Sequence, residues 1–134
     1  MATIKTQHKG DMLFETQLGR HKLQIDVPAR MGGSDRGPQP PDVFMASLGA
    51  CVAALVADYC NRANLNTDGL TVDVTYEGAS DPVRLVDVCV NIDLPNADIS
   101  GRELAIRRVA DQCPVHQTIC TLESVDIEVR GRSA

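Results

Sequence analysis

Aromatic residues are scarce in this sequence: two tyrosines, two phenylalanines and no tryptophan occur among 134 residues. The core must therefore be built from aliphatic side chains, and the stacking platforms that bind single-stranded nucleic acids are largely missing. Positive charge is also in deficit, because 18 Asp and Glu residues outnumber 13 Lys and Arg residues and give a formal net charge of -5. Phosphate contacts need a basic face, so the composition predicts no nucleic-acid partner.

Long hydrophobic runs are missing as well. The N-terminal segment MATIKTQHKGD has no apolar stretch of the kind that a signal peptide needs. The most hydrophobic segment, Val43–Ala57, is fifteen residues without a charge, which is short of the roughly 20 that cross a bilayer. We therefore predict a cytoplasmic protein that makes no membrane contact. An apolar share of 43% with 23% charged residues predicts one folded domain over residues 1–134.

The cysteines lack the spacings of a metal site. No Cys-x-x-Cys pair and no His/Cys cluster with zinc spacing occurs, so neither a metal nor a cofactor is predicted. An odd number of cysteines without an export signal also argues against a disulfide framework. The five are Cys51, Cys60, Cys89, Cys113 and Cys120. We expect Cys60 to be a buried apolar residue and Cys89 to be exposed on the polar face of a strand, which leaves reactivity as the special role for a cysteine here.

The first part of the chain alternates apolar and polar residues and predicts a meander of short antiparallel strands. Leu23, Ile25 and Val27 are separated by polar residues, and Leu18-Gly19 supplies a turn. Residues 28–41 contain three glycines and four prolines, so this segment is predicted to be a loop. Loops of this length tend to be functional or mobile.

A long helix is predicted next, from Pro40-Pro41 to about Asn61. Prolines suit the first helical turn, and Asp42 places a negative charge at its positive end. Apolar residues cover nearly every direction around this helix, as in a helix surrounded by protein. Because one small sheet shields only one face, a second subunit must supply part of the cover, and we predict a homodimer.

The remaining segments predict two strands, a helix and a final strand. Alternation predicts half-buried strands over residues 71–78 and 83–95. A second helix is predicted over about 101–112, because Ser100 and Glu103 have the spacing of a capping box. Pro114 disfavours helical geometry at Cys113, so we expect an accessible cysteine at a break. Val125, Ile127 and Val129 alternate with charged residues and predict a last strand.

Two local strings resemble the OsmC/Ohr family (osmotically inducible protein C and organic hydroperoxide resistance protein). The string PPDVFMASLGAC, residues 40–51, is similar to the central helix of that family, and Cys113-Pro114-Val115-His116 is similar to its second-cysteine motif. Val27-Pro28 followed by Met31-Gly32-Gly33 resembles the loop that leads into the helix. The similarity extends over nearly the whole chain, and the two cysteine motifs occur in the family's order.

This resemblance implies a fold and a chemistry. The fold is α+β and OsmC-like, with antiparallel sheets around long central helices in an interlocked homodimer whose active sites lie at the interface. The chemistry is that of a thiol peroxidase. Cys51 attacks an organic hydroperoxide and becomes a sulfenic acid, Cys113 traps it as a disulfide, and a dithiol reductant of lipoyl or thioredoxin type reopens that disulfide.

The resemblance further implies an arginine beside the peroxidatic thiolate. Among Arg20, Arg30 and Arg36, Arg30 best suits the OsmC-like branch, while Arg20 suits the Ohr-like one, and the choice between them stays open. Peroxidases of the family carry a glutamate directly after the helix-opening proline, where it orients that arginine, but Pro41 stands at this position and Asp42 follows it.

His116 is either a proton-transfer group or an exposed histidine without a role. The predicted catalytic residues are therefore Cys51, Cys113 and Arg30. The alternative function, which the departure at Pro41 keeps open, is a catalytically weak protein that binds an apolar small molecule at the dimer interface.

Overall fold

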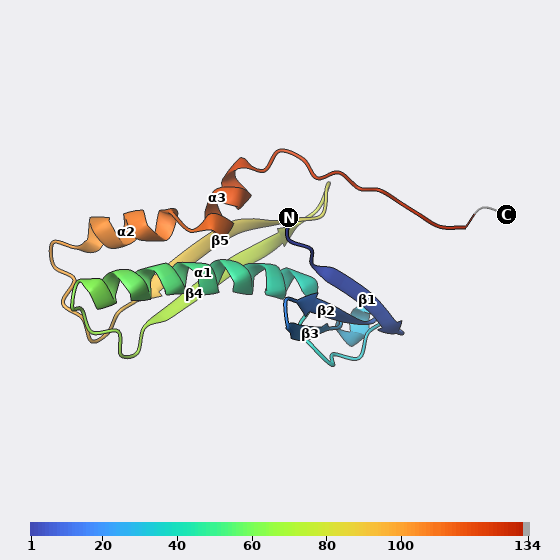
Figure 1. Ribbon diagram of the computed structural model, residues 1–134, viewed down its shortest axis with the longest axis horizontal. Coiled ribbons are helices and arrows are strands. Elements are labelled where there is room, and N and C mark those ends of the chain that lie inside the picture. The colour runs from blue at the N-terminus through green and yellow to red at the C-terminus, as the bar shows by residue number, and fades with distance from the viewer. Residues whose placement is uncertain (133–134) are drawn as a thin grey trace. The chain divides into compact units, whose positions relative to one another are not determined.

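The computed structural model describes residues 1–132, and Figure 1 shows its elements. Nine elements follow one another in these residues: β1 Lys5–Gly10, β2 Leu13–Leu18, β3 His21–Ile25, the 3-10 helix η1 Ala29–Met31, α1 Pro40–Arg62, β4 Thr71–Ala79, β5 Arg84–Asp93, α2 Glu103–Asp111 and α3 Pro114–Thr121. The predicted α+β class is confirmed.

The chain divides into two compact units. The first contains residues 1–49 and 73–91, and the second contains residues 50–72 and the described chain from residue 92 onward. The helix α1 and the strands β4 and β5 contribute residues to both units. That residues 1–134 fold as one domain stays a prediction.

The three-stranded sheet of the first unit is an antiparallel meander in the order β1-β2-β3. Thr16 lies at its centre, paired with Thr6 on one side and with Leu23 on the other. The side chain of Thr16 is buried, and its hydroxyl lies 2.8 Å from that of Thr6. The two-residue connection between β2 and β3 begins with Gly19, whose φ of 61° is left-handed. The predicted meander is confirmed.

Asp26 is a fully buried carboxylate that the alternating pattern did not identify. Because β3 ends at Ile25, the following residue leaves the pleat, and the loop folds over its side chain. Its Oδ2 accepts hydrogen bonds from Ser34 N (3.3 Å), Arg36 N (3.1 Å) and Arg36 Nε (2.6 Å), and its Oδ1 accepts from Val27 N (2.7 Å). The Arg36 guanidinium, with these amides, lowers the pKa of Asp26 to about 2. Apart from η1, the predicted loop is confirmed, and Asp26 holds it together.

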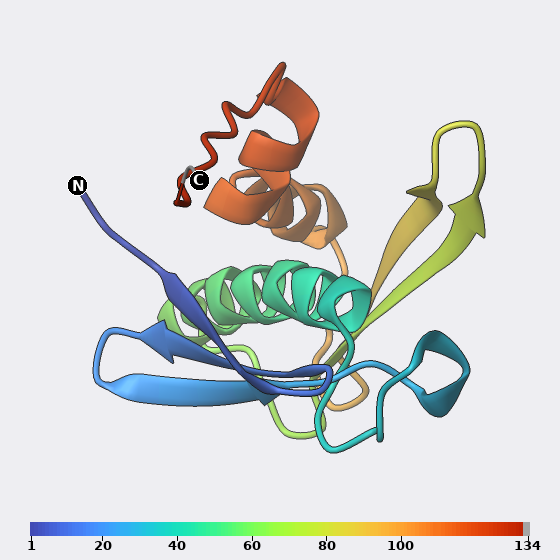
Figure 2. The same ribbon diagram turned by 90° about the vertical axis from the view of Figure 1, so that its right-hand side faces the viewer.

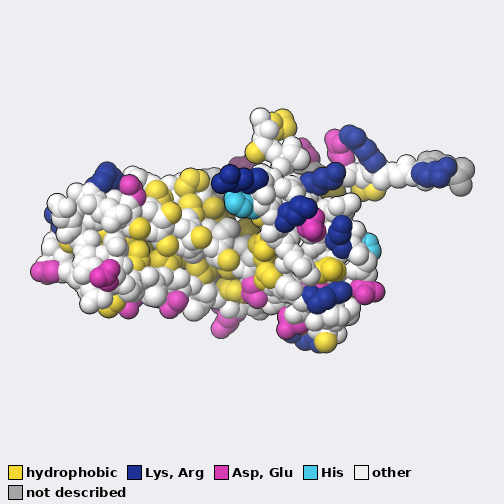
Figure 3. Space-filling model, turned by 60° about the horizontal axis from the view of Figure 1, so that its bottom comes forward, with side chains coloured by type: hydrophobic (Ala, Val, Ile, Leu, Met, Phe, Trp, Pro, Cys, Tyr) yellow, Lys and Arg dark blue, Asp and Glu magenta, His cyan; other side chains and the backbone are white. Residues whose placement is uncertain are grey.

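The predicted long helix is confirmed as α1. It ends at Arg62, one residue beyond the predicted end at about Asn61. Its buried apolar side chains are Met45, Leu48, Val52, Val56 and Cys60. They recur every three or four positions and form one stripe. The rest of the helix is less covered: Phe44 is 46% exposed, and Ala50 and Ala54 are exposed. On the face in Figure 3, hydrophobic side chains form a band over the part of the molecule where α1 runs.

By length and composition alone, α1 could cross a membrane. Its mean hydropathy over 18 residues is 1.8, and 33% of that stretch is buried. The charge-free run is the shorter segment 43–57 within this helix. The core helix of a soluble protein satisfies the same test, so this property is weak evidence for a membrane span.

The strands β4 and β5 pair in a two-stranded sheet, which Figure 2 shows as a long hairpin. Val72, Val74 and Tyr76 of β4 are half-buried and alternate with exposed residues, as predicted. In β5 the alternation is broken, because Asp87 has a left-handed φ of 54°. This irregularity turns the pleat, and Val88 is therefore exposed.

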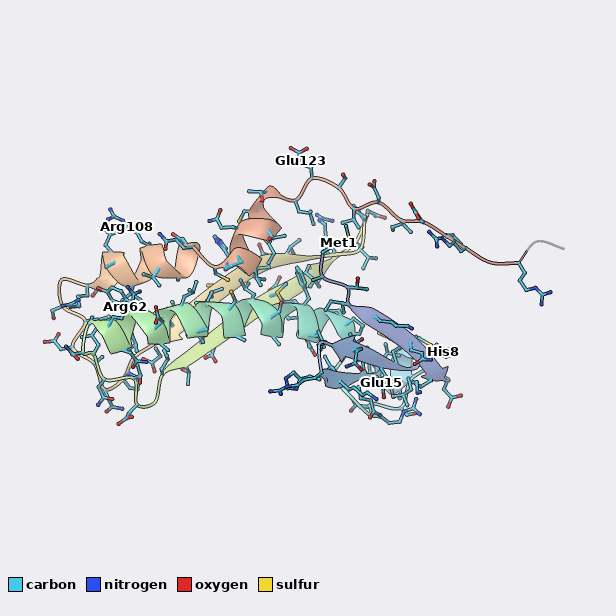
Figure 4. All side chains as sticks on the ribbon, viewed as in Figure 1. Met1, His8, Glu15, Arg62, Arg108 and Glu123 are labelled. Atoms are coloured by element: carbon cyan, nitrogen blue, oxygen red, sulfur yellow. The ribbon has the colours of Figure 1, made fainter. Side chains whose placement is uncertain are left out.

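In the second unit, α2 lies beside the C-terminal half of α1 in both ribbon views (Figures 1 and 2). Arg102, directly before α2, donates a hydrogen bond from Nη1 to the Tyr59 hydroxyl at 3.1 Å. The predicted capping box is not formed, because Gly101 has a left-handed φ of 74° and Arg102 is the N-cap without a side-chain hydrogen bond. The helix is accordingly shorter than predicted. Figure 4 labels Arg108 on α2 and Arg62, which ends α1 and pairs with Asp58 at 3.1 Å.

The predicted last strand, residues 125–129, is wrong for the single chain. From Glu123 onward the described chain has no regular structure (Figures 1 and 4). Val125 is 70% exposed, Ile127 85% and Val129 91%. A strand is defined by hydrogen bonds to a neighbour, and among residues 1–132 no strand pairs with this segment.

Candidate functional site

Cys51 lies in the middle of α1 among small residues. Gly49 and Ala50 precede it and Ala53 and Ala54 follow it, so no large side chain from these positions surrounds the thiol. The Cys51 side chain is half-buried and free. Small neighbours of this kind let another group approach the sulfur closely.

Cys113 lies between α2 and α3 and is completely buried. This corrects the prediction that a proline break would leave it accessible. Pro114 occupies the first turn of α3, so the chain continues directly into a helix instead of opening. Cys113 is the N-cap of that helix, and its Sγ accepts a hydrogen bond from the His116 backbone N–H at 3.5 Å.

The structure brings the thiols of Cys51 and Cys113 together within the second unit. The pKa of Cys113 is raised, first because the thiol is buried and second because the Cys51 thiol is a close neighbour. The backbone N–H groups of Val115 and His116 act in the opposite direction and are outweighed. Both thiols are free, so the pair is a dithiol of two neighbouring cysteines.

The three candidate arginines have different environments in the first unit. Arg30 lies in η1 and is exposed, and it makes no ion pair with another residue among 1–132. Arg20 is exposed in the connection between β2 and β3. Arg36 is bound to Asp26 through Nε at 2.6 Å. That contact gives Arg36 a structural role, so Arg30 and Arg20 are the two arginines of the predicted set that form no ion pair with the described residues 1–132.

Asp42 hydrogen-bonds to a tyrosine that the sequence had not connected with it. The Tyr76 hydroxyl donates to Asp42 Oδ1, and Gln39 Nε2 donates to Asp42 Oδ2 at 3.1 Å. The hydrogen bond to Asp42 raises the pKa of Tyr76, with burial as a lesser cause. Within residues 1–132, Asp42 pairs with no arginine. Alternation had identified Tyr76 only as a half-buried strand residue, because a contact 34 positions away leaves no local signal.

Within residues 1–132, no group of three or more His, Cys, Asp or Glu residues has the arrangement of a metal site. The arrangement that stands out is therefore the dithiol. In this α+β fold, the long helix α1 carries one free thiol and the N-cap of α3 carries the other. These features define the class of the protein: an α+β protein with a pair of neighbouring free cysteines.

The family is shown by the sequence itself. Residues 32–130 match the family described as OsmC-like protein. This match covers well over half of the chain, and the protein belongs to the OsmC-like family. Among proteins with curated descriptions, none matches this sequence.

Solved structures have the same fold. A protein from Psychrobacter arcticus 273-4, described as a candidate osmotic stress induced and detoxification response protein, has a TM-score of 0.78 at 22% identity, with 88% of each chain covered. An organic hydroperoxide resistance protein OsmC from Legionella pneumophila has a TM-score of 0.63 at 20% identity, with 90% of this chain and 91% of that chain covered. An organic hydroperoxide resistance protein from Elizabethkingia anophelis has a TM-score of 0.65 at 20% identity, with 91% of each chain covered. The TM-scores establish a shared fold, and at identities this low the similarity establishes the fold alone.

Proposed function

We propose that this protein is a cytoplasmic, cysteine-based peroxidase that reduces organic hydroperoxides and works as a homodimer. The observation that carries the proposal is that two free thiols, half-buried Cys51 and buried Cys113, are close neighbours. The Cys51 thiolate attacks one oxygen of the hydroperoxide, the O–O bond breaks, and the alcohol leaves with a proton. The Cys113 thiol then displaces hydroxide from the Cys51 sulfenic acid, which forms the disulfide and water. A dithiol of lipoyl or thioredoxin type returns two electrons and two protons to the pair.

The difference in burial supports Cys51 as the thiol that meets the substrate. Cys51 is half-buried, whereas Cys113 is completely buried. A peroxide reaches the more open sulfur first, and the thiol that only has to meet a neighbouring sulfur has no need of solvent access. Burial also favours the neutral form of Cys113, which makes Cys113 a poor choice for the first attack on the peroxide.

The substrate class is supported by the side chains of α1 around Cys51 and by the names of proteins with the same fold. Aliphatic side chains dominate α1 around Cys51, which suits the organic part of a hydroperoxide. Two of the solved structures that share this fold carry organic hydroperoxide resistance in their names. We extend this substrate class to the present chain as part of the proposal.

The proposal assigns activation of Cys51 to Arg30. An ordinary thiol is mostly protonated at neutral pH, and a nearby guanidinium favours the thiolate. Arg30 has no competing ion pair in the described chain. We expect Arg30→Ala to slow alkylation of Cys51 near neutral pH, with Arg20→Ala as the matched control. The opposite ranking would assign the role to Arg20, and no change in either variant would remove arginine activation from the proposal.

A homodimer is supported by two features of the single chain. The helix α1 buries one stripe of its surface and leaves apolar residues such as Phe44 exposed. The C-terminal segment carries three alternating apolar residues with no partner strand in the described chain. A second copy covers the helix and pairs with the segment, which removes both from water.

Peroxide consumption with a dithiol reductant is the test of this function. We expect the protein to consume cumene hydroperoxide faster than hydrogen peroxide, Cys51→Ser to abolish turnover, and Cys113→Ser to stop at a sulfenic acid on Cys51. Mass mapping after one equivalent of cumene hydroperoxide should find a Cys51–Cys113 disulfide. Oxidation that falls on Cys89, or that is scattered over all five thiols, would exclude the peroxidase mechanism.

The second candidate function is that of a binding protein for an apolar small molecule. The observation that favours it is the engagement of Asp42 by Tyr76, together with Pro41 at the position of the family's glutamate. With Asp42 held in this way, Arg30 has no carboxylate to orient it in the described chain. Absence of peroxide turnover, combined with saturable binding of an apolar fluorescent probe, would favour this function.

A further inference from the structure

The helix α3 carries a second thiol, Cys120, in contact with a histidine. Cys120 Sγ lies 3.6 Å from His116 Nε2, one helical turn earlier. Cys120 is exposed. The other ring nitrogen, His116 Nδ1, lies 3.2 Å from the backbone oxygen of Asp111, the last residue of α2. The imidazole therefore connects a fixed carbonyl on one side with a thiol on the other.

The carbonyl decides which nitrogen of the ring is protonated. A backbone carbonyl oxygen only accepts hydrogen bonds, so His116 Nδ1 must donate its proton to Asp111 O. A neutral imidazole carries one N–H group, and Nε2 is then an acceptor with a free lone pair. The thiol of Cys120 is the donor in the contact with Nε2. A base is thus already aligned with the proton that the sulfur must lose before it can react.

We propose that Cys120 and His116 form a second nucleophilic site, which exchanges with small-molecule disulfides and makes Cys120 a site of reversible S-thiolation. Cys120 Sγ attacks one sulfur of the disulfide, and its proton passes to His116 Nε2. The S–S bond of the small molecule breaks, and the departing thiolate takes the proton back from the imidazolium. One mixed disulfide forms, one thiol is released, and the reaction needs no other oxidant.

This site is separate from the Cys51–Cys113 pair. Cys113 is the N-cap of α3 and Cys120 lies in its last turn, seven residues later. At about 1.5 Å of rise per residue, the helix holds their Cα atoms roughly 10 Å apart. A disulfide requires about 7 Å or less, so in the folded helix Cys120 does not replace Cys113 as the resolving thiol.

The same chain contains a matched control, Cys89. This cysteine is also exposed, but its Sγ lies 3.9 Å from Asn91 Oδ1, a side-chain amide oxygen. An amide oxygen accepts a hydrogen bond and does not take up a proton near neutral pH. Cys89 and Cys120 therefore differ in whether a base is present, within one molecule and one experiment.

The test measures mixed-disulfide formation on the full chain with hydroxyethyl disulfide at neutral pH, followed by mass mapping. We expect Cys120 to react at least about fivefold faster than Cys89, because an ordinary thiol is mostly protonated at this pH. His116→Gln should lower the Cys120 rate to about that of Cys89. Gln117→Ala is the matched variant: Gln117 Nε2 also donates to Asp111 O, at 2.6 Å, and its loss leaves the imidazole in place and the Cys120 rate unchanged.

Three results would overturn the proposal. These are equal rates at Cys120 and Cys89 in the unaltered protein, a Cys120 rate that His116→Gln leaves unchanged or raises, and equal losses in His116→Gln and Gln117→Ala. A rise in His116→Gln would mean that the ring shields the sulfur. The site is independent of the peroxidase proposal, because Cys51→Ser should leave the Cys120 rate as it was while peroxide turnover is lost.

Discussion

Asp26 is a single carboxylate on which the segment before α1 depends, because four hydrogen bonds from three residues end on it. Its pKa falls from the ordinary 3.8 to about 2 in the folded chain. A carboxyl whose pKa is lower in the folded state stabilises the protein above its ordinary pKa, and this stabilisation is lost as the pH falls through the folded value. The stability of the protein should therefore decline between about pH 4 and about pH 2.

We expect Asp26→Asn to remove this decline and to lower Tm at neutral pH by several degrees. The measurement is thermal or urea unfolding followed across the acidic range. Asp73→Asn, an exposed residue of β4, is the control and should behave like the unaltered protein. An unchanged acid profile in Asp26→Asn would show that Arg36 does not hold this carboxyl.

The contact between Tyr76 and Asp42 has a spectroscopic signature. Asp42 raises the pKa of Tyr76 by accepting its hydroxyl proton in a hydrogen bond. Asp42→Asn should therefore lower the pKa of Tyr76 toward its ordinary value. The chain has only two tyrosines and no tryptophan, so a Tyr59→Phe background leaves Tyr76 as the only phenol in an ultraviolet titration. If the titration midpoint of Tyr76 does not move in Asp42→Asn, the hydrogen bond between Tyr76 and Asp42 is contradicted.

At the scale of elements, the loop from residue 28 to 39 is folded tightly onto β3 and Asp26. Asp35 N donates to Val27 O at 3.2 Å, and Asp26 N donates to Pro38 O at 3.3 Å. A Cβ at Gly33 would overlap Val27 O and lie 2.6 Å from Asp26 Oδ1. The position is thus restricted to glycine by close approach of the backbone.

Gly33→Ala should destabilise the protein by about 1–3 kcal/mol, the usual cost of forcing an atom into a packed site. Gly78→Ala on β4 is the control, because a Cβ there meets no atom within 4 Å. Denaturant unfolding of the two variants gives the comparison. Equal stabilities of the two variants would show that the loop can accommodate a Cβ atom at residue 33, contrary to the prediction.

At the scale of the whole molecule, the C-terminal segment links the single chain to its proposed assembly. Ile127 is 85% exposed in the single chain, which is costly for a large apolar side chain. If a second copy pairs with this segment, Ile127→Lys should weaken the dimer and lower its molar mass in light scattering at micromolar concentration. Glu128→Gln changes the charge by the same amount on the next residue and should leave the dimer intact. A monomer in the unaltered protein would contradict the homodimer.

The sequence by itself determined the type of most elements up to residue 112, and the family. Alternation in residues 71–79 and a three-to-four-residue apolar repeat along α1 are local patterns, and each follows from backbone geometry alone. The two cysteine motifs were recognisable for the same reason, since each occupies a few consecutive residues. Element ends were less certain: the pattern at Ser100 and Glu103 suggested a cap, but the left-handed Gly101 between them prevents it.

Only the tertiary structure decided which polar groups and thiols are buried and what they contact. The alternating pattern predicts Asp26 as a solvent-facing strand residue, yet it is covered by a loop that includes Arg36, ten residues later in the sequence. Cys113 reads as an open break, yet α3 begins at once and closes over the thiol. The C-terminal alternation is real in the sequence, yet it forms no strand in the described chain. For Asp26 and for the C-terminal segment, the outcome depends on residues distant in sequence. A local pattern describes one surface, whereas burial and strand pairing also need a second surface.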